Sequence, residues 1–417
     1  MLLLCSTSAS ALIARVDDHR LSYEPAPAKL QSSASRQVQT GHLETVKPAI
    51  SNTPVTYHGG PVMSSNTNYA LYWDPPGASE YPAGYETGID RYFEDVAHDS
   101  GGLQNTDSIL TQYYDQAGEH ANYDSHFAGA LLDTDPYPAN GCSEAPTCLT
   151  DAQLRNELRA YVEAHKLPID LAHEYFVLTP PGVEGCYEAA GHSCSAGTKH
   201  AAYCAYHSFI ATEKGTLVYA DNPYVAGLGC DPGEEHPNDN PSDATIAGGL
   251  AHEHSESVTD PEINAWFDSK EEEVADKCRT FKPKTEFGEP LGQAPDGANY
   301  NEVINGDLYL YQQIWSNETG ACEQRVAASP TIKKLAPKTG PTSGETAVKI
   351  SGANFTSSAT VKFGAAAATG VTFESSTSLT AYSPTASAGT VNVTVTTAAG
   401  TSAIVKKDQF KYKAPKK

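Results

Sequence analysis

The sequence predicts an α+β body followed by a separate all-β sandwich, and three observations support this. Residues 55–329 mix segments of helical spacing with segments of alternating apolar spacing. Eight of the nine cysteines lie within this stretch. From residue 330 onward the chain has no cysteine and becomes a series of short alternating runs separated by glycine-rich turns. That pattern indicates a small antiparallel sandwich over 330–413, with a basic tail at 414–417.

The first 54 residues show no globular pattern. Residues 1–11 begin with three leucines after Met1 and end in small residues, which resembles a truncated secretory signal peptide without its basic region. Residues 12–54 are rich in Ala, Ser and Pro and have no sustained apolar period, so we expect a flexible leader or a propeptide. We expect no membrane span anywhere in the chain.

Within the body, several elements follow from spacing and capping signals. They are a strand at 68–73, a helix at 85–97, a helix at 151–165 capped by Thr150, a central strand at 174–179, one or two strands within 203–220, and a helix at 244–258 capped by Ser242-Asp243 and ended by Asp260-Pro261. Mixed strands and helices of this kind indicate an α+β domain.

The last of these helices carries the most informative residues of the chain, His-Glu-His-Ser-Glu at 252–256. Residues four apart share a helix face, so His252 and Glu256 can bind one metal ion, as the two histidines of an H-E-x-x-H helix bind zinc. Glu253 occupies the position of the general base in such sites. The pattern predicts a zincin-like body that performs metal-assisted hydrolysis. A surface helix that is merely rich in His and Glu is the alternative, but the apolar start of this helix indicates burial.

The third metal ligand is open among three acidic residues. Asp260 ends the helix, and Asp276 precedes Cys278, which could hold it in place through a disulfide. Glu262 has the spacing of the third ligand in metzincins, but Thr259 stands where those chains have a turn-forming glycine. Asp260 and Asp276 are therefore preferred over Glu262.

Charge and cysteine content indicate an exported protein. The chain has 28 Lys and Arg against 51 Asp and Glu, a net charge of −23, which disfavours nucleic acid as a partner. Apart from Cys5, the cysteines are even in number, and pairing each with its neighbour closes the shortest loops. Eight cysteines allow 105 pairings, so the sequence leaves the connectivity open, and neighbour pairing would give 142–148, 186–194, 204–230 and 278–322. Disulfides indicate a secreted, extracellular or cell-envelope protein.

A loop over residues 221–243 is dense in Asp, Asn and Glu. Such hard oxygen ligands can bind calcium, although the spacing matches no EF-hand, and a solvated acidic loop is the competing interpretation. Four histidines, at positions 192, 200, 207 and 254, are candidates for extra ligation or for transition-state stabilisation. His254 should point away from His252, because residues two apart on a helix do not share a face.

The C-terminal runs closely resemble an IPT/TIG domain, an immunoglobulin-like module, over their whole length. The residues that carry this resemblance lie at 330–337, 340–344, 348–355, 361–364, 389–395 and 400–402. Glu345 departs from the family, in which a second glycine is common. The resemblance implies a spacer or an accessory module that contacts a cell surface or a polysaccharide.

The body resembles, through short scattered motifs over residues 55–325, the phosphate-induced, EXORDIUM-like secreted proteins and bacterial relatives that carry H-E-x-x-E-x-x-T-D-P. These motifs lie at 57–62, 204–207, 219–224, 252–261 and 276–278, with Trp266 between the last two. Plant members lack the His-Glu pair, so the resemblance alone does not imply catalysis.

Three functions compete at this point. The first is a secreted zinc metallopeptidase acting on a peptide or protein substrate. The second is a non-catalytic extracellular or cell-wall protein with a structural metal. The third is a glycosidase that uses Glu253 and Glu256, and it ranks last because both residues lie on one helix and cannot flank a sugar.

Overall fold

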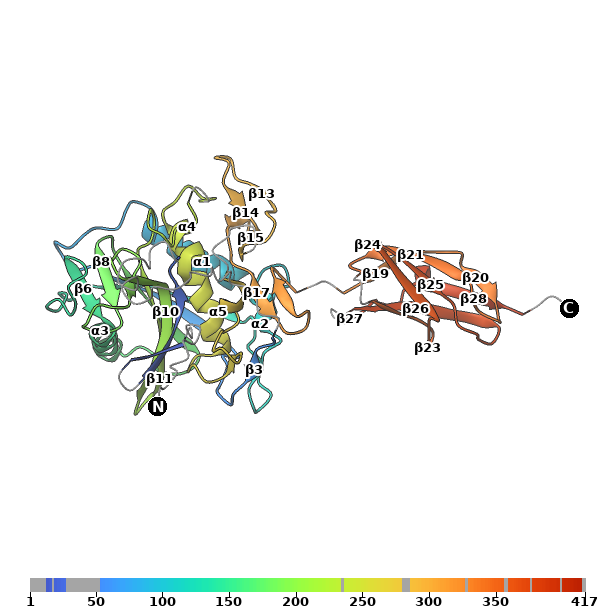
Figure 1. The fold of residues 1–417 in the computed structure, drawn as a ribbon, viewed down its shortest axis with the longest axis horizontal. Coiled ribbons are helices and arrows are strands. Elements are labelled where there is room, and N and C mark those ends of the chain that lie inside the picture. Colours follow the sequence, from blue (N-terminus) through green and yellow to red (C-terminus); the bar gives the residue numbers. More distant parts are fainter. Residues whose placement is uncertain are drawn as a thin grey trace, which may run out of the picture. The chain divides into compact units, whose positions relative to one another are not determined.

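The computed structural model describes residues 13–16, 19–27, 53–233, 236–279, 286–326, 329–355, 359–375, 377–397 and 400–414. The chain divides into two compact units, Met1–Arg325 and Val326–Lys417 (Figure 1). Among the described residues, no helix is both long enough and apolar enough to cross a membrane.

One large mixed sheet organises the first unit. Its strands run in the order β5 (Ser125–Asp133), β4 (Asn66–Trp73), β7 (His173–Thr179), β11 (Gly215–Pro223), β10 (Ala201–Thr212), β9 (Cys194–Ser195), β8 (Val183–Cys186) and β6 (Thr147–Thr150). The first four are parallel, and β10 runs antiparallel to β11. The strands expected at 68–73, 174–179 and within 203–220 are confirmed.

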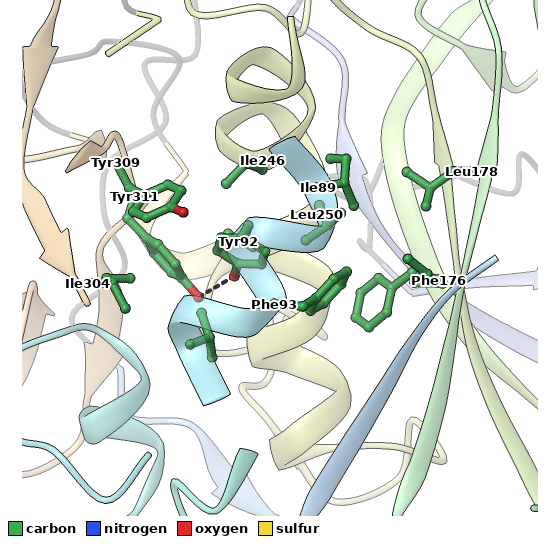
Figure 2. Close-up of a cluster of buried hydrophobic side chains, with 14 of the residues drawn as sticks. Ile89, Tyr92, Phe93, Phe176, Leu178, Ile246, Leu250, Ile304, Tyr309 and Tyr311 are labelled. Carbon is green, nitrogen blue, oxygen red and sulfur yellow. Dashed lines mark hydrogen bonds between the residues drawn. The ribbon is translucent and has the colours of Figure 1, made fainter. Parts of the chain in front are cut away.

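Helices cover both faces of this sheet (Figure 1). Side chains alternate along β7, so Phe176 and Leu178 face one core while Tyr175 and Val177 face the other. The first core holds α1 (Tyr85–His98) and residues leading into α5 (Ala251–Thr259), and Figure 2 shows its aromatic side chains. The second core holds α3 (Asp151–His165), which begins at the predicted cap. There Gln153 N–H donates to the Thr150 hydroxyl at 3.4 Å, within a capping box.

The helix expected over 244–258 is not continuous. It consists of a short α4 (Ser242–Thr245), a π-helical turn η2 (Ile246–Leu250) and α5. Neither Ser242 nor Asp243 caps it, because both already lie inside α4 and Pro241 occupies the N-cap position. The π turn contains Gly248 and Gly249, the two residues with the weakest helix preference in the segment.

Part of the segment expected to be a leader belongs to the sheet. Strands β1 (Ile13–Val16) and β2 (His19–Pro25) form a hairpin, and β2 pairs antiparallel with β10. Residues 12, 17–18 and 28–52 of that expected leader lie outside the described part of the chain, as does the whole expected signal peptide, residues 1–11.

The described part of the first unit also contains small two-stranded sheets. They are β3 (Thr56–Tyr57) with β12 (Trp266–Phe267), β13 (Gly292–Gln293) with β14 (Asn299–Tyr300), β15 (Glu302–Ile304) with β16 (Asp307–Tyr309), and β17 (Ile314–Ser316) with β18 (Ala321–Glu323). Two short helices, α2 (Asp107–Leu110) and the 3-10 helix η3 (Asp276–Cys278), complete the unit. All four disulfides follow the neighbour pairing: Cys142–Cys148, Cys186–Cys194, Cys204–Cys230 and Cys278–Cys322.

The second unit is the predicted sandwich. One sheet has the order β19 (Thr331–Ala336), β21 (Ala347–Ala353), β25 (Ser378–Tyr382) and β24 (Gly370–Ser375). The other contains β20 (Thr339–Pro341), β28 (Gln409–Lys413), β26 (Gly389–Thr397), β22 (Thr360–Phe363) and β23 (Ala366–Ala367), with β27 (Gly400–Thr401) beside β26. A 3-10 turn, η4 (Lys406–Asp408), precedes β28. Glu345 has φ of 57°, a left-handed conformation that explains why glycine suits this position.

Candidate metal centre

The π turn brings α5 close to the sheet. A Cβ atom on Gly249 would lie 2.7 Å from the Cβ of Ala205 on β10 and 3.1 Å from Glu24 Oε2 on β2. Only glycine permits this approach, and the approach places His252, Glu253 and Glu256 beneath β10 and β2. Each of these three side chains is almost completely buried.

Three polar atoms converge next to α5. The Nε2 atom of His252 lies 3.3 Å from Glu256 Oε2 and 3.4 Å from Asp276 Oδ1. All three atoms are buried, and none of them has a hydrogen-bond partner in acceptable geometry. Buried polar atoms are nearly always hydrogen-bonded, so an unpartnered imidazole nitrogen that lies beside two unpartnered carboxylate oxygens is compatible with a bound metal ion.

The other polar atoms of the same side chains are held by the protein. His252 Nδ1 donates to Gln312 Oε1 at 3.1 Å, and this leaves Nε2 directed at the cluster. Glu256 Oε1 accepts the N–H groups of Ala275 and Asp276 at 3.1 and 3.0 Å. Asp276 Oδ2 accepts the Glu273 N–H at 3.0 Å. Such outer hydrogen bonds orient metal ligands in known sites.

The two distances from His252 Nε2 are compatible with ligand atoms that share one metal ion. Bonds of about 2.0–2.2 Å place neighbouring ligand atoms of a tetrahedron about 3.3–3.6 Å apart. The two measured separations from His252 Nε2, 3.3 and 3.4 Å, lie in that range. His252, Glu253 and Glu256 also form a group with ligand atoms within 4.8 Å of one another, as do His207, Glu256 and Glu273. His252, Glu253 and Glu256 are therefore a buried His/Glu group able to bind a metal, and Asp276 lies beside the histidine of this group.

The remaining predicted ligands lie outside this cluster. Both oxygens of Asp260 accept backbone N–H groups of the turn that follows α5, from Asn264 and Ala265 at 2.6 Å and from Trp266 at 3.2 Å. Glu262 accepts the Thr216 hydroxyl at 2.6 Å. The structure brings Asp276 beside His252 and gives Asp260 the role of stabilising a turn.

Glu253 points to the sheet instead of to Asp276. Its Oε2 lies 3.0 Å from His207 Nδ1, and its Oε1 accepts the backbone N–H of Glu24 at 3.1 Å. Burial, followed by repulsion from Glu256, raises the pKa of Glu253 well above its usual value. Burial lowers the pKa of His207. A carboxyl and an imidazole shifted in this way can share one proton, as a general acid–base pair requires.

The centre holds a large excess of buried acidic groups: Glu24, Glu253, Glu256, Glu273 and Asp276. Burial and then Glu256 raise the pKa of Asp276 to about 8. Burial and then Glu256 also raise the pKa of Glu273. For His252, burial acts to lower the pKa, but Glu256 and Asp276 together raise it well above the usual value. A bound divalent cation would favour the ionised forms of these carboxyl groups.

Sequence reasoning identified the helix but not its full surroundings. His207 was one of four candidate histidines, and nothing in its sequence context singled it out. Glu273 sits in an acidic run that suggests solvent exposure, yet it is fully buried. Gln312 and Glu24 gave no signal, because their roles depend on contacts between distant segments.

Other predicted features lie elsewhere. His254 points away from His252, as expected, and its Nε2 lies 2.8 Å from Asn66 Oδ1. His200 pairs with Glu144. In the loop over 221–243, Asp231 accepts N–H groups from Gly227 and Gly233, and Asp243 accepts two hydrogen bonds from Asn238. None of the described residues of this loop belongs to a group of three converging metal ligands.

Comparisons with known proteins bear mainly on the second unit. No curated protein matches the chain. Three solved structures that match cover small parts of this chain, each with a TM-score below 0.2. They include the plexin A4 extracellular region (26% identity, TM-score 0.18, 20% of this chain and 8% of that chain). The protein SGBP-B from a xyloglucan utilization locus in Bacteroides uniformis matches at 25% identity and TM-score 0.19 (24% and 28%). A gamma-CGTase from alkalophilic Bacillus clarkii matches at 23% identity and TM-score 0.19 (28% and 17%).

This chain thus spans less than a third of each of these proteins. The family comparison is more specific, because the model described as "IPT/TIG domain" matches residues 330–412. These residues coincide with the strands of the second unit. Residues 330–412 are therefore an IPT/TIG domain.

Proposed function

We propose that the body is a zinc-dependent hydrolase, and most specifically a secreted metallopeptidase. The observation that carries the proposal is the set of three unpartnered buried atoms, His252 Nε2, Glu256 Oε2 and Asp276 Oδ1. They combine one imidazole and two carboxylates, a donor set that suits zinc. The four disulfides support an exported protein.

In this proposal each residue has a defined role. His252, Glu256 and Asp276 hold the metal, and a bound zinc ion would polarise a peptide carbonyl and acidify water. Glu253 takes up a proton at its carboxylate and passes it to the departing amine. His207, 3.0 Å from Glu253, holds that carboxylate in place and shares its proton. Gln312 keeps the Nε2 atom of His252 free for the metal.

A glycosidase is less well supported by the same geometry. Glu256 is directed towards His252 and Asp276, whereas Glu253 is directed towards His207. Both carboxylates come from one helix, with no space between them in which a sugar could bind from two sides.

The second candidate is a non-catalytic extracellular protein. One observation favours it: His252, Glu253, Glu256 and Asp276 are all closed off from solvent in this structure. In that case the cluster would be a structural metal site, or a metal-free ion pair between protonated His252 and Glu256. The IPT/TIG domain would then supply the main activity, contact with a cell surface or a polysaccharide.

Substitutions at two adjacent positions separate these candidates. His252→Ala should lose both zinc and hydrolysis of denatured protein, because it removes one of about three ligands. Glu253→Gln should keep zinc but lose roughly 10²- to 10⁴-fold in rate, the usual value of a positioned general base. Zinc is measured by elemental analysis, and turnover is measured for both the intact chain and a chain cleaved within residues 28–52.

Glu262→Gln serves as the matched control, because Glu262 lies on the same segment but bonds to Thr216 outside the cluster. It should change neither zinc content nor rate. Zinc present without hydrolysis in either form of the chain would favour the structural-metal candidate. Undiminished turnover of Glu253→Gln would exclude the proposed proton transfer.

A further inference from the structure

Strand β2 pairs with β10 on the edge opposite β11, next to the short pairing of β10 with β9, and its backbone contacts the candidate metal centre. In the β2–β10 pairing, Ser22 lies opposite His207 and Glu24 lies opposite Ala205. The register shifts between Tyr203 and Ala205, and there the N–H of Glu24 donates to Glu253 at 3.1 Å. An extended backbone therefore presents a peptide N–H to the carboxylate that we assign as the general base.

The side chain of Glu24 is buried between Arg279 and Gly249. Its carboxylate forms an ion pair with Arg279, and both side chains are buried. Its Oε2 lies against Gly249, where a Cβ would approach it to 3.1 Å. Arg279 also pairs with Glu286, so the guanidinium stays in position from the body side. A buried carboxylate needs such a partner, because an unpaired charge in this place would be strongly destabilising.

The way in which the β1–β2 hairpin is connected to the body would allow it to dissociate from β10. Residues 13–27 contain no cysteine, and 25 residues, 28–52, separate them from the rest of the described body. On its other side β10 stays paired with β11 over seven residue pairs, so the sheet does not depend on β2 for continuity. Without β2, β10 would present an unpaired edge, which binds extended peptides by backbone hydrogen bonds.

We infer that β2 occupies the peptide-binding edge of β10 and keeps the metal centre closed until β2 dissociates. This inference rests on the proposed function. A substrate then binds as an extended strand antiparallel to β10. Arg279 selects an acidic side chain at the place of Glu24. The substrate class is thus an extended peptide with an Asp or Glu beside the metal centre, and residues 13–27 act as an intramolecular competitor.

The test uses the full chain with a site-specific protease sequence inserted at residues 36–41. The chain is cut, the released segment is removed by dialysis, and a fluorescent peptide of residues 13–27 is added back. We expect saturable binding of this peptide, with hydrolysis of an acidic peptide substrate appearing after the cut and falling as the peptide is added. The Glu24→Gln peptide should bind about tenfold more weakly or worse, because a charge-assisted hydrogen bond is lost.

Two protein variants identify the pocket. Arg279→Gln should weaken binding of the unmodified peptide by a similar factor. The variant should also bind the unmodified and Glu24→Gln peptides equally, a combination of results that loss of structure alone would not produce. Glu271→Gln is the matched control, because it removes the partly exposed pair that Arg20 of β2 makes with Glu271. It should change binding by less than about threefold. If Arg279→Gln does not fold, the comparison of the two peptides still decides.

The outcomes separate this inference from the proposed function. Equal activity of cut and uncut chains, or equal binding of the two peptides, would overturn the inference even if zinc-dependent hydrolysis were found. Glu24-dependent binding without any hydrolysis would support the peptide edge and count against catalysis. Glu253→Gln protein should still bind the peptide, so binding does not rely on turnover.

Discussion

The arrangement around His252 is decided by single atoms. His252, Glu256 and Asp276 each direct one polar atom to a backbone or amide partner and the other polar atom to the cluster. Asp260 and Asp276 show the difference most clearly. Both are buried acidic residues after α5, but both oxygens of Asp260 accept backbone N–H groups, whereas Asp276 keeps Oδ1 without a hydrogen-bond partner.

The raised pKa values at this centre predict how zinc binding depends on pH. In the metal-free protein Asp276 has a pKa of about 8, so its carboxyl is protonated at neutral pH. Zinc must displace that proton, and its affinity should therefore fall as the pH drops below about 8, by roughly tenfold per unit for each proton released. Competition with a chromophoric chelator at pH 6, 7 and 8 measures this.

Asp276→Asn provides the comparison, because it removes the titrating carboxyl. It should make zinc affinity depend less steeply on pH and should lower that affinity overall. The folding stability of the metal-free protein should depend on pH in the opposite direction to its zinc affinity. Its folded-state pKa lies above the unfolded value of 3.8, so this carboxyl disfavours folding increasingly as the pH rises towards 8. An affinity that is constant from pH 6 to 8 would show that Asp276 is not protonated in the metal-free site.

At the scale of elements, the π turn before α5 sets the distance between helix and sheet. Gly249→Ala should destabilise the body by about 1–3 kcal/mol, because the new methyl group meets the Cβ of Ala205 at 2.7 Å. Thermal unfolding of the body measures the loss. Gly370→Ala in the second unit is a control, since its Cβ would make only ordinary contact, at 3.5 Å with Tyr382. An unchanged midpoint for Gly249→Ala would mean that the helix can shift freely.

The disulfide Cys278–Cys322 connects η3, which carries Asp276, to β18. Replacing both cysteines with alanine should lower zinc affinity about tenfold or more, because a ligand-bearing turn loses its support. Stability should fall by about 2–5 kcal/mol as well. The matched control is removal of Cys142–Cys148, which closes a loop of separation 6 away from the cluster and should leave zinc affinity unchanged. Equal effects of the two removals on zinc would contradict this coupling.

Elements with strong local signals could be predicted from the sequence, and contacts between segments could not. The helix α3 begins and ends as its Thr150 cap and apolar spacing indicate. The cysteines pair with their neighbours in sequence. The π turn, in contrast, depends on how closely Gly249 approaches Ala205, and the pairing of β2 depends on the free edge of β10. Short strands carry too few residues to signal such pairing.

At the scale of the whole molecule, the two units differ in composition and in how they are held together. The body contains all four disulfides and two apolar cores on opposite faces of its sheet. The IPT/TIG unit has one core between its two sheets and no cysteine. Residues 330–417 carry eleven lysines and three acidic residues, a net charge of +8. Because the whole chain has a net charge of −23, the rest of the chain has a net charge of −31. Each unit therefore has its own basis for stability.

This division predicts that residues 326–417 fold on their own. Their core, which includes Val348, Ile350, Val393 and Phe410, is completed within the unit, and the structure divides the chain at Arg325. The isolated fragment should unfold cooperatively at the midpoint it shows in the full chain, and the remaining body should keep its zinc affinity. Calorimetry of the full chain and of both fragments measures this. Loss of cooperative unfolding in the isolated fragment, with the full chain intact, would show that the IPT/TIG unit depends on the body.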